Sequence, residues 1–118
     1  MVKFEDLKNH TLKSIKRVED EELIFKTKNR TFVLYHSQDW CENVYIEDIC
    51  GDLDDIVGHP LLLVEEVIKD SVDNNYGSET WTFYKMSAIK GNVTIRWCGE
   101  SNSYYSETVD FKELTESW

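Results

Sequence analysis

The sequence predicts a mainly β domain of the α+β class, an antiparallel meander that forms a curled sheet, sandwich or open barrel with short terminal helical turns. Short segments rich in β-branched and aromatic residues recur along the chain, and turn-forming residues separate them. The length of 118 residues is close to the commonest domain size, and a 41% apolar share is enough for a packed core. We therefore expect a single domain over residues 1–118.

The individual elements follow from alternation and turn chemistry. A helical turn is expected at residues 3–9, and strands at residues 11–18, 23–27, 31–36, 44–49, 80–86, 93–98 and 104–111. The segment Leu61–Ser71 fits either a strand or a helix, and its short apolar run after Pro60 favours a strand. Residues 51–58 are expected to form a loop or one helical turn, and residues 112–118 a helical turn or a frayed end.

Charge and cysteine content narrow the class of protein. The net charge of −10 disfavours direct binding to nucleic acid or to an anionic membrane, because both need clustered lysine and arginine. Three cysteines are too few for a disulfide scaffold, and the N-terminus lacks an apolar signal segment. The longest purely apolar run, Leu61–Val64, is far too short to span a membrane. These features predict a cytoplasmic protein.

The negative charge is concentrated in the middle of the chain. Residues 39–73 hold eleven acids against Lys69 alone, a net charge of −10. This segment has three interpretations: a solvated face, a docking surface for a basic protein partner, or a divalent-cation site at Asp52, Asp54 and Asp55. The calcium-loop pattern is not met. The residues expected to contact a basic partner are Glu47, Asp48, Asp52, Asp54, Asp55, Glu65 and Glu66.

A second candidate site lies around residue 40. His36, Asp39 and Cys41, with Cys50, carry ligand types that suit zinc, although the spacing matches no paired-ligand motif. Cys41 could also act as a nucleophile beside His36 or His59. The chain has no glycine-rich phosphate loop and no nucleophile elbow. We therefore expect no cofactor and prefer a binding function to catalysis.

The aromatic residues of the C-terminal half have two interpretations. They are Trp81, Phe83, Tyr84, Trp97, Tyr104 and Tyr105. Their strand periodicity favours core packing, while an exposed subset could anchor a protein interface. Base stacking is disfavoured because few lysines and arginines accompany them in the sequence.

Two motifs carry a resemblance to a known family. They are His36-Ser37-Gln38-Asp39-Trp40-Cys41-Glu42 and Ile46-Glu47-Asp48-Ile49-Cys50-Gly51-Asp52-Leu53. With these motifs the chain resembles an uncharacterised family of small bacteriophage and bacterial proteins, in which cysteine often stands at the place of Trp40. The resemblance implies a phage or prophage origin and assigns no activity.

Together these features predict a small acidic phage-type accessory protein that binds a basic surface of a host or phage protein, with imitation of nucleic acid as one form. The alternative is a metal- or ligand-binding domain or small enzyme with its site around His36, Asp39 and Cys41. A third interpretation is a virion or assembly component.

Overall fold

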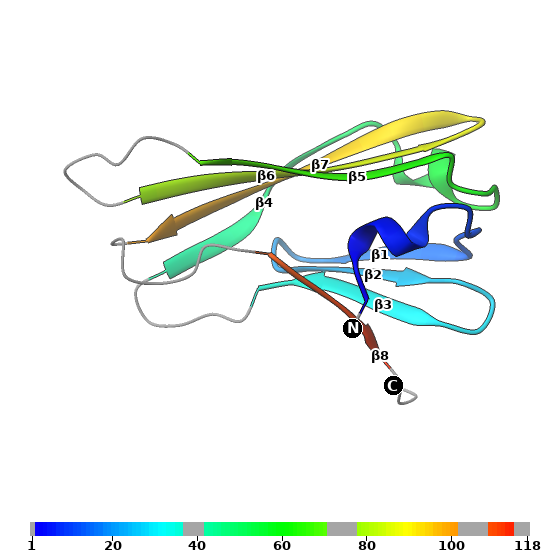
Figure 1. Cartoon of the computed structure of the whole chain (residues 1–118), viewed down its shortest axis with the longest axis horizontal. Coiled ribbons are helices and arrows are strands. Elements are labelled where there is room, and N and C mark those ends of the chain that lie inside the picture. The colour runs from blue at the N-terminus through cyan, green and yellow to red at the C-terminus, as the bar shows by residue number, and fades with distance from the viewer. Residues whose placement is uncertain (1, 37–41, 71–77, 102–108, 115–118) are drawn as a thin grey trace.

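Eight antiparallel strands form two four-stranded sheets in the described part of the chain. The computed structural model describes residues 2–36, 42–70, 78–101 and 109–114. The strands are β1 (Ser14–Val18), β2 (Glu22–Lys26), β3 (Thr31–Tyr35), β4 (Glu42–Cys50), β5 (Leu63–Asp70), β6 (Ser78–Ala88), β7 (Gly91–Ser101) and β8 (Asp110–Leu114). The sheet orders are β1-β2-β3-β8 and β4-β7-β6-β5. Figure 1 shows the two sheets as stacked layers, so the chain is a sandwich.

Alternation along β2 and along most of β7 builds the core between the layers. In β2, Leu23 and Phe25 are fully buried, and the residues between and beside them face outward. In β7, the residues Val93, Ile95 and Trp97 are buried in the same way. Successive side chains of a strand point to opposite faces, so each sheet contributes one apolar face to a shared core.

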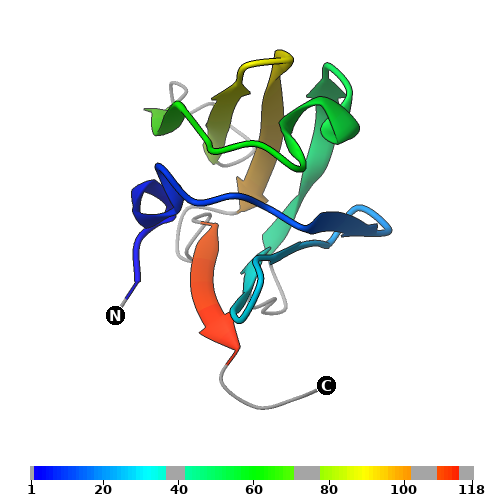
Figure 2. The ribbon, with the colours of Figure 1, turned by 90° about the vertical axis from the view of Figure 1, so that its right-hand side faces the viewer.

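Two short 3-10 helices lie at opposite sides of the sandwich (Figure 2). The helix η1 (Phe4–Leu7) begins where the Asp6 carboxylate accepts a hydrogen bond from the Lys3 amide at 2.8 Å, and it buries Phe4 and Leu7 against the core. The helix η2 (Leu53–Ile56) follows β4 and contacts β7, β6 and β1. Within the described residues, no helix is long and apolar enough for a membrane crossing.

The structure confirms the predicted fold class and most of its strands. The ambiguous segment after Pro60 is a strand, β5, and the aspartate-rich segment before it holds the single helical turn η2. The end of the chain differs from the prediction, because Lys112–Leu114 belong to β8 and are not helical. The predicted strand at 104–111 lies mostly outside the described residues, and so do residues 115–118.

A bidentate ion pair fixes β8 to the turn between β2 and β3. Nε and Nη2 of Arg30 each donate to a carboxylate oxygen of Glu113 at 2.9 Å, and the Arg30 guanidinium also lies 4.9 Å from the centre of the Phe32 ring. The Arg30 hydrogen bonds hold the pKa of the Glu113 carboxyl below its ordinary value of 4.5. This pairing is the strong, geometrically specific form of an ion pair.

The lowered pKa of Glu113 predicts acid sensitivity. A carboxyl whose pKa is lowered by folding stabilises the fold above its unfolded pKa, and that contribution is lost as the pH falls through the folded pKa. The variant Arg30→Gln is therefore expected to be less stable than the natural protein at pH 7, and the difference should shrink below pH 4.5. Urea unfolding of both proteins across this range measures it. A difference that is the same at all pH values would contradict the assignment.

Candidate functional site

The seven predicted acidic residues separate into two groups in the structure. Glu47 and Asp48 lie on β4, and Asp52, Asp54 and Asp55 lie at the adjoining helix η2. The other two, Glu65 and Glu66, lie on β5. Strands β4 and β5 are the two opposite edges of one sheet, with β7 and β6 between them. The seven residues therefore do not form one continuous surface.

The turn between β1 and β2 adds acids to the β4 group that the sequence analysis missed. The Ile46 amide donates a hydrogen bond to the Asp20 carbonyl at 2.8 Å, which places this turn against β4. The turn carries Glu19, Asp20 and Glu21, all of which are exposed. The run of acids at 19–22 is visible in the sequence, but no local pattern predicts that it packs beside β4. We call the combined surface the acidic edge; it comprises Glu19, Asp20, Glu21, Glu47, Asp48, Asp52 and Asp54.

A β-bulge shapes the acidic edge at its centre. The pairing of β4 with β7 shifts register between Ile46 and Asp48, so that Glu47 is the extra residue. A bulge bends its strand and re-aims the side chains beside it. Asp48 faces Arg96 at 3.9 Å across the strand pair, and Glu47 is exposed. The bulge therefore points one acid to solvent and the next one toward a cation on the outer face of the sheet.

Two of the predicted acids have local structural roles. The Asp52 carboxylate accepts a hydrogen bond from the Asp54 amide at 3.0 Å and caps the first turn of η2. Asp55 is half-buried, and its carboxylate lies against Gly91 in the turn between β6 and β7. Asp54 is exposed, so it is the better choice for testing a binding role.

The predicted metal and nucleophile candidates are described only in part. His36 follows β3 and is half-buried, while Asp39 and Cys41 lie outside the described residues. His59 is half-buried between η2 and β5. Across residues 2–36, 42–70, 78–101 and 109–114, no group of three His, Cys, Asp or Glu residues is arranged to hold a metal ion. The candidate site around His36 stays a prediction from the sequence.

Cys50 has an environment that disfavours the thiolate. Its Sγ donates to the Asp48 carboxylate at 3.4 Å, and that hydrogen bond, with the negative charge of Asp48, raises the pKa of the exposed Cys50 thiol. The Arg96 charge acts in the opposite direction but more weakly. The thiolate is the nucleophilic form of cysteine, so this arrangement makes Cys50 a poor nucleophile.

Removing the Asp48 charge is expected to make Cys50 more reactive. The variant Asp48→Asn should lower the pKa of the thiol and increase its rate of reaction with iodoacetamide at pH 8, measured by mass spectrometry of the peptide that contains Cys50. Glu65→Gln is a matched control, because it removes one negative charge at the opposite edge of the sheet. Equal rates in the natural protein and Asp48→Asn would contradict the assigned role.

The aromatic residues of the C-terminal half divide between the core and the outer face. Tyr84 and Trp97 are buried, as predicted for core residues, whereas Trp81 and Phe83 are half-buried on the outer face. The Arg96 guanidinium lies 5.3 Å from the Trp81 ring centre, and the Lys69 ammonium lies 5.9 Å from that of Phe83. The sheet therefore supplies the cations that the sequence analysis found lacking beside these rings. Residues 104 and 105 lie outside the described residues.

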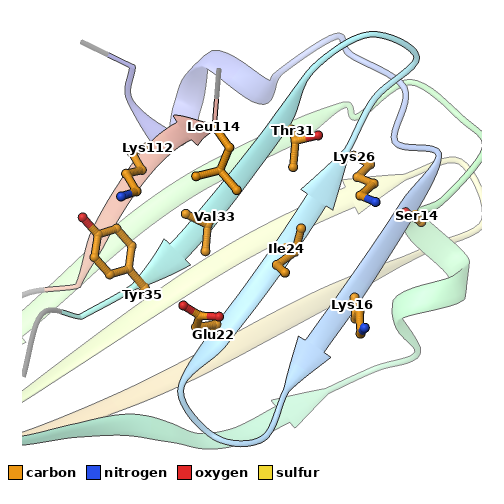
Figure 3. A pocket seen from close by; sticks show the side chains of 10 residues that line it. All are labelled: Ser14, Lys16, Glu22, Ile24, Lys26, Thr31, Val33, Tyr35, Lys112 and Leu114. Carbon is orange, nitrogen blue, oxygen red and sulfur yellow. The ribbon is translucent and has the colours of Figure 1, made fainter. Parts of the chain in front are cut away.

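A groove with a net positive lining crosses the outer face of the sheet β1-β2-β3-β8 (Figure 3). Its charge is opposite to that of the acidic edge. It has a volume of about 570 Å³ and is lined by Ser14, Lys16, Glu22, Ile24, Lys26, Thr31, Val33, Tyr35, Lys112 and Leu114. Three lysines face one carboxylate in this lining, and the floor is apolar. No single segment of the sequence identifies this groove, because its residues come from four strands.

The described chain is thus a small antiparallel β-sandwich with two charged surfaces of opposite sign. It belongs to the family described as a domain of unknown function, DUF7448, whose model matches residues 5–111. No curated protein and no solved structure matches the chain. The family match runs from η1 into β8 and confirms that the chain is a member of an uncharacterised family.

Proposed function

We propose that the protein is a small phage-type accessory protein that acts in the host cytoplasm and binds a basic surface of a host or phage protein through its acidic edge. The observation that carries the proposal is the hydrogen bond between the Ile46 amide and the Asp20 carbonyl. It joins the acidic turn of one sheet to the acidic strand of the other, and the acidic helix η2 follows directly after that strand.

The charge balance of the acidic edge supports binding to a cationic partner. Arg17 donates to the Asp20 carboxylate, and Arg96 lies 3.9 Å from Asp48, so these two acids have a cation nearby. The exposed carboxylates of Glu21, Glu47 and Asp54 add negative potential at the same side. Surfaces of this kind attract basic partners and select among them, and their on-rates fall as salt rises. A surface of spaced carboxylates also resembles the phosphates of a nucleic acid, which favours a partner that normally binds one.

A pair of charge-reversal variants tests the proposal. In the first, Glu47→Lys and Asp54→Lys change the acidic edge; in the second, Glu65→Lys and Glu66→Lys make the same change in net charge on β5. Both are immobilised beside the natural protein, exposed to bacterial lysate at low salt, and eluted with a salt gradient. Circular dichroism of each variant checks that it is folded.

The expected result is a basic protein that the natural chain and the β5 variant retain and the acidic-edge variant does not. Elution of this protein by a short DNA duplex would support imitation of nucleic acid. Equal capture by all three chains, or capture by none, would overturn the proposal, because a specific docking surface must distinguish the two edges.

A further inference from the structure

We propose that the groove on the outer face of β1-β2-β3-β8 binds an extended peptide segment of a partner protein, in which two acidic side chains flank an apolar one. This surface is separate from the acidic edge and has the opposite charge, so the proposal goes beyond the function proposed above. The groove offers an apolar floor, cationic ends and a length that matches such a segment.

The floor of the groove is formed by the two central strands. Ile24 of β2 and Val33 of β3 are direct partners in the antiparallel register, and both face outward. Val33 is only 5% exposed although it lies on the outer face, because the neighbouring lining side chains cover it. An apolar side chain inserted here would exchange contact with water for contact with this floor, which is the favourable term in most recognition sites.

Lysines mark the two ends of the same row. The register pairs Lys16 of β1 with Ile24, and Lys112 of β8 with Val33, so the four residues cross the sheet in line. Figure 3 shows the two lysines on the outer strands with the apolar residues between them. A ligand that lies across the sheet at this level therefore meets a cation, an apolar surface and a second cation in sequence.

The spacing of this row fits an extended peptide. Strands β1 and β8 are three strand spacings apart, a distance of about 14 Å at the usual separation of neighbouring strands. In an extended peptide, positions one and five are about 13 Å apart and point to the same side as position three. Acids at positions one and five would therefore reach Lys16 and Lys112, while an apolar residue at position three lies over the Ile24–Val33 pair, where half-buried Ile24 offers the larger contact.

The electrostatics of the groove favour an anionic occupant. Lys26 adds a third cation in the adjacent row, and Glu22 is the single acid among the ten lining residues. The ammonium of Lys112 lies 5.0 Å from the centre of the Tyr35 ring, which holds this lysine over the groove. The volume of about 570 Å³ falls in the range of sites that enclose a drug-sized ligand.

Fluorescence anisotropy with a labelled pentapeptide tests this inference. The probe is Glu-Ser-Leu-Ser-Glu with a fluorescein label on an amino-terminal linker and an amidated end. One control peptide carries Lys in place of both Glu residues, and another, Ser-Glu-Leu-Glu-Ser, places the acids only two positions apart. The protein variants are Lys16→Gln with Lys112→Gln, and the control Lys85→Gln, which removes a lysine from the outer face of the other sheet.

We expect saturable binding of the first peptide that weakens with salt and falls roughly tenfold or more in the double variant, because charge-assisted contacts are lost. Lys85→Gln should bind as the natural protein does, and both control peptides should bind more weakly. Equal affinity for the three peptides, or no effect of the double variant, would overturn the proposal.

Two further outcomes would identify a different occupant of the groove. Displacement of the probe by decanoate at the same concentration as the peptide would indicate that the groove binds a small amphipathic anion, and it would overturn the proposal. Self-association that the double variant abolishes would identify a second copy of the chain as the occupant and would also overturn it.

Discussion

The substitution Gly51→Ala is expected to lower the free energy of unfolding by roughly 3–5 kcal/mol, through backbone strain and overlap in a packed region. Gly51 has a φ of +105°, a conformation that residues with a Cβ rarely adopt. A Cβ at this position would also lie 2.5 Å from the carbonyl oxygen of Asn92, a backbone atom of β7 that cannot rotate away. Chemical denaturation monitored by tryptophan fluorescence measures the loss.

A matched substitution separates the two causes of this loss. Gly58 has a φ of +88°, but a Cβ there would meet nothing within 4 Å. Gly58→Ala should therefore cost only about 1–2 kcal/mol, the conformational part alone. Equal losses in the two variants would show that the approach of Gly51 to β7 is unimportant. A large loss at Gly51 alone would confirm that the turn between β4 and η2 must lie directly against β7.

The second large effect is expected at Phe4. The variant Phe4→Ala should lose roughly 3–5 kcal/mol of stability, as buried aromatic residues generally do when truncated. Phe4 is 2% exposed, and its ring meets Tyr84 of one sheet at 4.7 Å and Phe111 of the other at 5.7 Å between ring centres, in edge-to-face arrangements. One side chain of η1 thus packs against both layers of the sandwich.

Phe83→Ala provides the comparison for Phe4→Ala. It removes the same side chain from the half-buried outer face of β6, where fewer neighbours surround it and less apolar area is lost from the core. Thermal unfolding followed by circular dichroism should show a distinctly smaller decrease in Tm for this variant. An equal decrease in the two variants would contradict the expectation that the contacts of Phe4 with both sheets stabilise the fold more than the outer-face contacts of Phe83 do.

The strands were predictable from the sequence because alternation is a local property. The aromatic segments of β6 and β7 show it over several residues, and the burial pattern follows it, whereas β5 was favoured by its short apolar run after Pro60. The predicted last strand ended at Phe111, whereas β8 continues to Leu114, because the polar residues Lys112 and Glu113 give no local sign of a strand. The position of β8 depends on the bidentate pair between Arg30 and Glu113, which are 83 residues apart in the chain.

The surfaces were less predictable than the strands. The sequence located the acidic segment of β4 and η2. Counting charge along the chain, however, left out the turn between β1 and β2, which packs on β4, and included β5, which lies at the opposite edge of the sheet. The hydrogen bond to Asp20 brings in a turn from the other sheet, while Glu65 moves to the far edge. The groove depends on Lys16 and Lys112, which are nearly a chain length apart and unremarkable in their own segments.

The pairing of β3 with β8 also bears on the order in which the protein folds. The register joins Thr31 to Leu114, whereas the hairpins of β1 with β2 and of β6 with β7 close through short turns. Closing a long segment costs chain entropy before its contacts are gained, and such pairings slow folding. We therefore expect the β8 pairing to form late, after the hairpins. A chain still emerging from the ribosome could already present part of the acidic edge, but the groove can exist only when Lys112 and Leu114 have been synthesised and paired.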